Sequence, residues 1–348
     1  MVAKIRNSQG SWTFIIPVYG LKLSKDTNNE FKVNHVTFVS KDKLFRLRKR
    51  FGVYEKLKEM EESDRKIHCY EWSETLAVVQ RTGKAVDLEG HVINLVREEL
   101  DILALSQLGY GKRTSNAAPS VDRRTAEEHS FLFVNTSNKQ AYSGFKTTGK
   151  WQDLSLNSRW VKWQKDLYFI KLIKILQGAS VANGKWTETL SRVSRLVGRS
   201  QTTTWLPNAF LLNMIAIETL LTREGDKYSE ELPKRIEAFI GWVGYWKDDD
   251  YKFKIKDVYK KRCQYVHSGN DSDIEVKDLL FTDDILFNLL YNIVVHIKMF
   301  SSKEKIVQFS DKVAAEKVLG VVGAKSKVRP KTLHFISKKY NDKDLKEI

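Results

Sequence analysis

Cysteine is scarce in this chain of 348 residues, which contains only Cys69 and Cys263. Two cysteines cannot supply the set of disulfides on which small secreted domains depend. They also cannot form paired CxxC zinc ligands, and the seven histidines are scattered rather than set at metal-ligand spacing. We therefore expect no metal, no other cofactor and a cytoplasmic location.

Long apolar runs are equally rare. The N-terminal run "FIIPV" is short and contains Pro17. It is too short for the core of a signal peptide, and a membrane-spanning helix needs about 20 apolar residues. No other segment approaches that length, so we expect no membrane partner.

Acidic residues are outnumbered. The chain has 59 Lys and Arg against 43 Asp and Glu, a net charge of +16. Such an excess favours partners that carry phosphates, nucleic acid first and an anionic membrane surface second. The alternative is a basic surface that serves only solubility. With 42% hydrophobic residues the chain has ample material for a core, and its length suits two domains.

Residues 1–150 have the pattern of a mixed α/β domain. Period-two alternation and turn residues predict strands at 11–23, 29–40, 75–86 and 130–136, a helix at 91–110, and a polar loop at 111–128. Within this part, residues 41–52 interleave basic residues with Phe45 and Phe51, which suits phosphate contacts and base stacking. The alternative for that stretch is a solvated helix face with aromatic residues turned to the core.

From about residue 151 the pattern becomes helical. Apolar residues three and four apart predict helices at 157–180, 208–221, 229–246, 255–267 and 278–300. Thr204 is a candidate cap and Pro207 suits the first turn of the second of these helices. We therefore predict an α+β protein, with an N-terminal α/β domain (1–150), an all-α bundle (151–300) and a basic C-terminal tail (301–348).

One short stretch contains a candidate catalytic pair. In "YKKRCQYVHSGND", residues 259–271, Arg262 and His267 lie near the end of a predicted helix that residues 268–270 stop. They are five residues apart, about 140° around a helix. Phosphodiester cleavage uses such a pair, a proton carrier and a fixed cation. By spacing alone, the two side chains fit equally a pair that complements the helix dipole. Glu218 lies in an apolar helix and is expected at its edge or buried with a partner.

Residues 155–300 resemble a HEPN domain, most closely the Apea-like group. In "VYKKRCQYVHSG", Arg262, His267 and Gly269 match the R-x4–6-H helix of that family. The glutamate of "NMIAIETLL", Glu218, and the arginine of "LPKRIEAFI", Arg235, match two earlier helices. Ser268 and Cys263 depart from the group's pattern.

The resemblance implies a metal-independent endoribonuclease in which a 2′-hydroxyl attacks the adjacent phosphate and leaves 2′,3′-cyclic phosphate and 5′-hydroxyl ends. His267 would move the proton, Arg262 would hold the phosphate, and Glu218 would orient Arg262 or a helix partner. Such nucleases usually act as homodimers that form one composite cleft, on tRNA or other cellular or phage RNA. The alternative is a non-catalytic HEPN module for nucleic-acid binding or dimerisation.

The resemblance also implies a role in anti-phage defence by abortive infection. In that role residues 1–150 would be a sensor that restrains the nuclease until a phage component arrives. The tail is then expected to guide RNA to the cleft, because its basic residues are not balanced by acids. The expected RNA-binding residues are Lys261, Lys325, Lys327, Arg329 and Lys331. Alternatively, residues 332–337, "TLHFIS", add a strand to the N-terminal domain.

Overall fold

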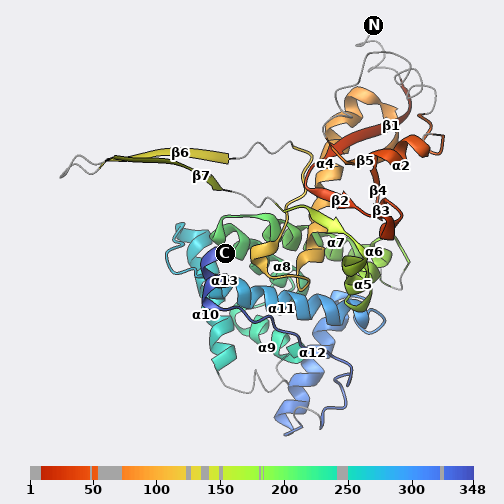
Figure 1. Cartoon of the computed structure of the whole chain (residues 1–348). Coiled ribbons are helices and arrows are strands. Elements are labelled where there is room, and N and C mark those ends of the chain that lie inside the picture. The colour runs from red at the N-terminus through yellow and green to blue at the C-terminus, as the bar shows by residue number, and fades with distance from the viewer. Residues whose placement is uncertain are drawn as a thin grey trace. The chain divides into compact units, whose positions relative to one another are not determined.

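The computed structural model (Figure 1) describes residues 9–47, 49–53, 73–122, 127–134, 141–148, 152–179, 182, 184–240, 250–321 and 325–348. The chain forms two compact units. The first comprises residues 1–31, 37–97 and 115–156, and the second comprises residues 32–36, 98–114 and 157–348. The predicted α+β class, with a helical C-terminal part, is confirmed. Two stretches of the first 150 residues, 32–36 and 98–114, belong to the helical unit.

The first unit is organised around a four-stranded sheet in the order β1-β5-β4-β3 (Figure 1). Its strands are β1 (Gln9–Val18), β3 (Glu30–Val33), β4 (Val36–Ser40) and β5 (Thr75–Lys84). The central strand β5 pairs antiparallel with both β1 and β4. The other pairs are β2 (Leu21–Leu23) with β8 (Leu154–Leu156), parallel, and the hairpin β6 (Glu127–Val134) with β7 (Ala141–Thr148). Each predicted strand segment therefore contains strands.

The basic stretch 41–52 packs on this sheet. It forms α2 (Lys41–Arg46) and a turn whose Phe51 is buried in a core with Val39, Leu44, Leu76 and Val78. Two of its cations bind one acid, because Nζ of Lys43 lies 3.0 Å and Nη2 of Arg50 lies 2.9 Å from the carboxylate of Glu30. The contacts of these residues are those of a helix turned to a core.

The predicted helix at 91–110 is α4 (Ala85–Ala104), followed by the 3-10 turn η3 (Leu105–Gln107). The C-terminal part of α4, from residue 98, belongs to the helical unit. There Gly198 of another helix packs so closely on it that an added Cβ would lie 1.7 Å from the carbonyl oxygen of Asp101. Glycine is therefore required at that crossing, since any side chain would displace the backbone.

The second unit is a helical bundle. Its elements are η4 (Arg113–Ser115), α5 (Ser158–Asp166), α6 (Phe169–Leu176), α7 (Gly184–Thr202), α8 (Leu206–Leu221), α9 (Tyr228–Ile240), α10 (Asp250–Ser268), α11 (Val276–Val295), α12 (Lys303–Val318) and α13 (Asp342–Glu347). The helix α8 packs on α7 and α11, and α9 packs on α12. Large aromatic side chains from helices of the bundle or their ends are buried in its core: Trp160, Tyr168, Phe169, Trp186, Phe210, Phe239 and Phe300.

Two of these helices differ from the prediction. Residues 157–180 form α5 and α6 rather than one helix, with a break at Leu167 (φ −82°, ψ −120°). The break accompanies the burial of Tyr168, whose ring packs edge-on against Phe287 and Tyr291 of α11 at 5.8 and 6.4 Å. The helix α7 was not among the predicted helices.

The start of α8 and the whole of α12 also depart from the prediction. The cap of α8 is Trp205, not Thr204, although Pro207 does lie in the first turn. Residues 303–318, expected to belong to the tail, form α12, and its Phe309 packs on Phe239 and Phe300 with ring centroids 5.1 and 5.0 Å away.

The described residues between α12 and Leu333 form turns and bends, and residues 332–337 form no strand. The predicted addition of a strand to the N-terminal domain is wrong, because the backbone of His334 and Ile336 bonds instead to side chains of α11. Among the described residues, no helix is both long enough and apolar enough to cross a membrane.

Candidate functional site

Arg262 faces the interior of the bundle because it continues an apolar stripe on α10. Ile255 and Val258 of that helix are buried, and Arg262 and Tyr265 follow at spacings of four and three residues. Residues at these spacings share one helix face. Since α10 packs on α8 and α9, this face directs the guanidinium of Arg262 toward α8.

Arg262 and Glu218 form an ion pair between α10 and α8. Nη2 of Arg262 donates to Oε2 of Glu218 at 2.8 Å. The side chains are 20% and 9% exposed, respectively, so this pair is largely removed from water. Of the two predicted situations for Glu218, the structure shows the buried one with a partner.

Burial dominates the electrostatics of this pair. It raises the pKa of Glu218 above its usual range, and the charge and hydrogen bond of Arg262 oppose the rise. Oε1 of Glu218 and Nε of Arg262 are buried and make no hydrogen bond within the described structure. An unpaired buried polar atom costs about 1–3 kcal/mol, so these two atoms lower the free energy of unfolding.

His267 lies elsewhere on the same helix. Its side chain is exposed in the last turn of α10, whereas Arg262 turns toward α8. The separation of about 140° between the two positions explains this difference. The helix ends at Ser268, and Gly269 follows with φ +68° and its N–H bonded to the carbonyl of Tyr265 at 3.0 Å. The predicted stop at 268–270 is confirmed. Within one chain, the structure brings Glu218 and Arg262 together but leaves His267 apart.

Two apolar side chains near the C-terminal end of α10 are exposed. Val266 is 48% exposed and Trp205, at the cap of α8, is 54% exposed. The ring of Trp205 stands at 90° to that of Tyr265 with centroids 6.4 Å apart, and the Tyr265 hydroxyl donates to Asn208 at 3.1 Å. Sequence reasoning missed these residues, although Tyr265 lies three residues from Arg262 and on its helix face.

Tyr259 and Cys263 complete the surroundings of the ion pair. Burial, followed by the hydrogen bond and charge of Cys263, raises the pKa of Tyr259 to about 12. Its hydroxyl therefore stays protonated at neutral pH. Glu218 and Arg262 also act electrostatically on Tyr259, with opposite signs. Cys263 is a half-buried free thiol, at one of the positions where the chain departs from the family pattern.

Lys261, expected to bind RNA, is already paired with acids. Its Nζ lies 2.9 Å from Asp278 and 3.1 Å from Asp257, and the side chain is 12% exposed. Burial disfavours its charge, but the two carboxylates outweigh burial and raise its pKa. Asp278 also belongs to the capping box of α11. The observed contacts of Lys261 therefore tie α10 to the start of α11.

Another residue that matches the family pattern, Arg235, is buried in a set of ion pairs. It is 1% exposed, bonds to Asp226 and to the carbonyl of Leu221, and lies 2.9 Å from Glu231. Its partners span the end of α8 and the start of α9. Arg235 therefore fixes the turn between these helices and lies outside the candidate site.

The basic residues of the tail differ in exposure. Lys325, Lys327 and Lys331 have exposed side chains. Arg329 donates instead from Nε to the carbonyl of Ala238 at 3.0 Å and from Nη2 to that of Glu237 at 3.1 Å. The carboxylate of Glu316 on α12 accepts from the backbone of Lys327 and Val328 at 2.8 and 3.2 Å, which holds this part of the tail on the bundle.

Among the described residues, no group of three or more His, Cys, Asp and Glu side chains is placed to hold a metal ion. Comparisons with protein-family models, with curated proteins and with solved structures gave no match to this chain.

Proposed function

We propose that this chain is a HEPN-type endoribonuclease that cleaves RNA through Arg262 and His267, with Glu218 as the residue that positions Arg262. The observation that carries the proposal is the buried Glu218–Arg262 ion pair between α8 and α10, with the exposed His267 five residues after Arg262 on α10. This is the set of residues that the family resemblance names. The net charge of +16 supports a polyanionic substrate.

In the proposed reaction, the 2′-oxygen of a ribose forms a bond to the adjacent phosphorus while the bond to the 5′-oxygen of the next nucleotide breaks. One proton leaves the attacking hydroxyl and one reaches the departing oxygen. A histidine side chain can perform both transfers at neutral pH. A fixed guanidinium stabilises the charge that builds on the phosphate. His267 has the exposure for proton transfer, and Arg262 supplies the fixed cation.

A second copy of the chain would complete such a site. Arg262 and His267 point in different directions on one α10, so a phosphate that touches both requires either movement of Arg262 or a histidine from another chain. Two exposed apolar side chains near the end of α10 provide surface for that contact: Val266, next to His267 in sequence, and Trp205, which packs on Tyr265. We therefore propose a homodimer in which the C-terminal ends of the two α10 helices meet.

The test is cleavage of labelled single-stranded RNA by the full-length protein in the presence of EDTA. We expect 2′,3′-cyclic phosphate ends, and we expect His267→Ala and Arg262→Ala to remove cleavage. His91→Ala and Arg159→Ala, at exposed positions far along the sequence, are matched controls that should cleave normally. Cleavage retained in His267→Ala, or cleavage that starts only on addition of a metal ion, would overturn the proposal.

The alternative is a non-catalytic RNA-binding or dimerisation module. One observation favours it: Arg262 is engaged by Glu218 within the chain. RNA binding without cleavage by a dimeric wild-type protein would establish that alternative. A role in anti-phage defence, with a phage component as the trigger, is tested in cells. The wild-type chain and His267→Ala are compared for toxicity with and without phage, and only the wild-type chain should stop growth of infected cells.

A further inference from the structure

One face of α11 contacts the C-terminal segment at regular intervals. Four side chains, three on that face and the fourth at the C-cap of the helix, are spaced four residues apart: Asp284, Asn288, Asn292 and His296. They contact backbone groups of every second residue of the extended segment, in the opposite chain direction: Lys338, Ile336, His334 and Thr332. We call the four helix residues the α11 row.

The two periods match for a geometric reason. Four residues of an α-helix rise about 6 Å. Two residues of an extended chain rise about 6.6 Å. Each step along the row therefore meets the next outward-facing backbone group of the segment, and the mismatch stays small over the length of the row.

The two asparagines bind the backbone as a neighbouring strand would. Asn288 donates to the carbonyl of Ile336 and accepts from its N–H, both at 2.7 Å. Asn292 does the same with His334, both at 2.9 Å. The second N–H of each amide donates to the helix carbonyl four residues earlier, at 2.7 Å to Asp284 and 2.9 Å to Asn288. The helix thus fixes both amides in the orientation that a peptide backbone needs.

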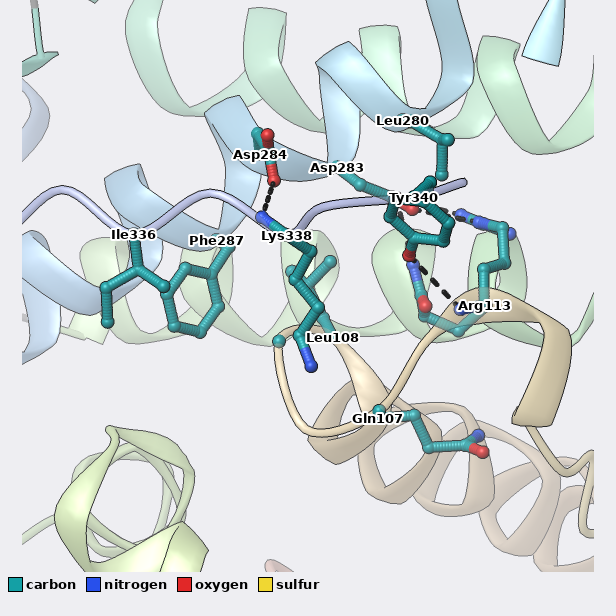
Figure 2. A pocket seen from close by; sticks show the side chains of 13 residues that line it. Gln107, Leu108, Arg113, Leu280, Asp283, Asp284, Phe287, Ile336, Lys338 and Tyr340 are labelled. Carbon is teal, nitrogen blue, oxygen red and sulfur yellow. Dashed lines mark hydrogen bonds and ion pairs between the residues drawn. The ribbon is translucent and has the colours of Figure 1, made fainter. Parts of the chain in front are cut away.

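Further polar contacts hold the two ends of the segment. At one end, the carboxylate of Asp284 accepts from the backbone of Lys338 at 3.4 Å (Figure 2) and from the hydroxyl of Ser337 at 2.5 Å. Beyond it, the Tyr340 hydroxyl accepts from the N–H of Arg113 at 3.2 Å (Figure 2). At the other end the ring of His296 lies 3.4 Å from the carbonyl of Thr332.

Side chains contribute unequally to this contact. Leu333 is 3% exposed and is the apolar anchor of the segment. Ile336 is 40% exposed, and the side chain of His334 is exposed although its ring meets Tyr291 edge-on at 5.3 Å. At the two positions that the asparagines bind, the main chain therefore makes the buried contacts, and the side chains point largely to solvent.

We propose that the α11 row is a receptor for an extended peptide backbone, that residues 332–338 of the same chain are its resident ligand, and that they form a strap which detaches without unfolding the bundle. The receptor is complete before the strap binds, since the asparagine amides are oriented by their own helix. The apolar core residues of α11, among them Leu289, Leu290 and Ile293, are fully buried. The strap follows α12, the last core helix in sequence, so its release leaves the connections between the core helices intact. The contacts of Tyr340 with Arg113 and of Asp344 with Lys112 lie beyond the strap.

The test uses hydrogen exchange of the backbone amides of residues 331–341 in the full-length chain. Ile336→Pro and His334→Pro each remove a backbone N–H that donates to an asparagine of the row. In the double variant, the remaining strap amides should exchange at least about tenfold faster. That factor corresponds to about 1.4 kcal/mol of binding. Ile336→Ala and His334→Ala keep the backbone and should keep most protection. Lys339→Pro, at an exposed position beyond the row, controls for proline itself. The amides of α8 and α11 should stay protected in every variant.

A second measurement asks whether the row binds a peptide supplied in solution. A labelled peptide of residues 330–341 should bind saturably to the double proline variant and not to the wild-type chain, whose own strap competes at high effective concentration. Three results would overturn the proposal: equal loss of protection in the alanine and proline variants, loss of protection throughout α11, or no binding of the peptide to the double proline variant. Strap protection that depends on protein concentration would overturn the assignment to the same chain and place the strap on a second copy.

Discussion

Replacing Arg262 by methionine is expected to destabilise the bundle in a way that depends on pH. Methionine keeps much of the apolar stem and removes the charge. Glu218, whose side chain is 9% exposed, then loses its cation. Removing one partner of a buried ion pair costs about 3–5 kcal/mol when the remaining charge stays uncompensated. Glu218 can avoid part of that cost by binding a proton, so the loss is not the same at every pH.

The direction of this pH dependence follows from the protonation state of Glu218 in the folded and the unfolded protein. Burial already raises its pKa, and Arg262 opposes that rise, so removal of Arg262 raises the pKa further. The unfolded chain releases this proton near about pH 4.3. Above that pH the folded form of Arg262→Met holds a proton that the unfolded form has released. Its free energy of unfolding therefore falls as pH rises through and above that value. We expect a small deficit at about pH 5 and a deficit approaching about 3–5 kcal/mol at about pH 8.

Glu218→Gln supplies the matched comparison. The glutamine oxygen still accepts from Arg262, so we expect a destabilisation of about 1–2 kcal/mol. This deficit should not grow with pH, because the raised pKa of Glu218 already lowers wild-type stability as pH rises. The double variant should be more stable at about pH 8 than the sum of the two single effects implies, because no buried charge is left alone. The assay is urea unfolding at the same two pH values, followed by the fluorescence of the buried tryptophans. An Arg262→Met deficit that is equal at both pH values would refute this account of the pair.

Three further predictions concern other parts of the chain. Burial raises the pKa of Asp284 from 3.8 to about 6, so the free energy of unfolding of the wild-type chain falls between about pH 4 and 6. Asp284→Asn should remove that fall and stabilise the protein by about 1–3 kcal/mol at about pH 8 but not at about pH 4. Urea unfolding curves at both pH values measure the difference. Gly198→Ala should cost about 3 kcal/mol or more, because its Cβ would collide with the backbone at Asp101, whereas Gly184→Ala meets no atom within 4 Å and should be nearly neutral in thermal unfolding. Alanine should replace the three exposed tail lysines together: Lys325, Lys327 and Lys331. The variant should lower the slope of log RNA affinity against log salt by about 0.7 for each phosphate that it no longer neutralises. An unchanged slope would exclude these lysines as RNA-binding residues.

Local patterns predicted much of the fold because they record contacts within one element. The segments 11–23 and 29–40 showed the alternation of strands in a half-buried sheet, and Gly269 marked the end of α10, where it adopts a left-handed backbone. The α11 prediction at 278–300 was right for the same reason, an apolar period of three and four.

The misses depend on residues far apart in sequence. The residues around Tyr168 do not indicate that its ring packs on Phe287. The break between α5 and α6 could therefore not be predicted from residues 157–180 alone. The role of Asn288 was hidden likewise, because its partner Ile336 lies 48 residues further on. The pairing of Glu218 with Arg262 was predicted only through the family resemblance, and the engagement of Lys261 by Asp278 was not predicted.

The different burial of Arg262 and His267 has a consequence for natural selection. Arg262 is tied into the bundle by Glu218, so most changes at these two positions damage folding together with any activity. His267 is exposed, and many residues can replace it while the protein stays folded and abundant. If the chain is toxic when expressed, escape mutants that retain full-length protein should therefore concentrate at His267, whereas mutants at Glu218 or Arg262 should be recovered mainly as degraded protein.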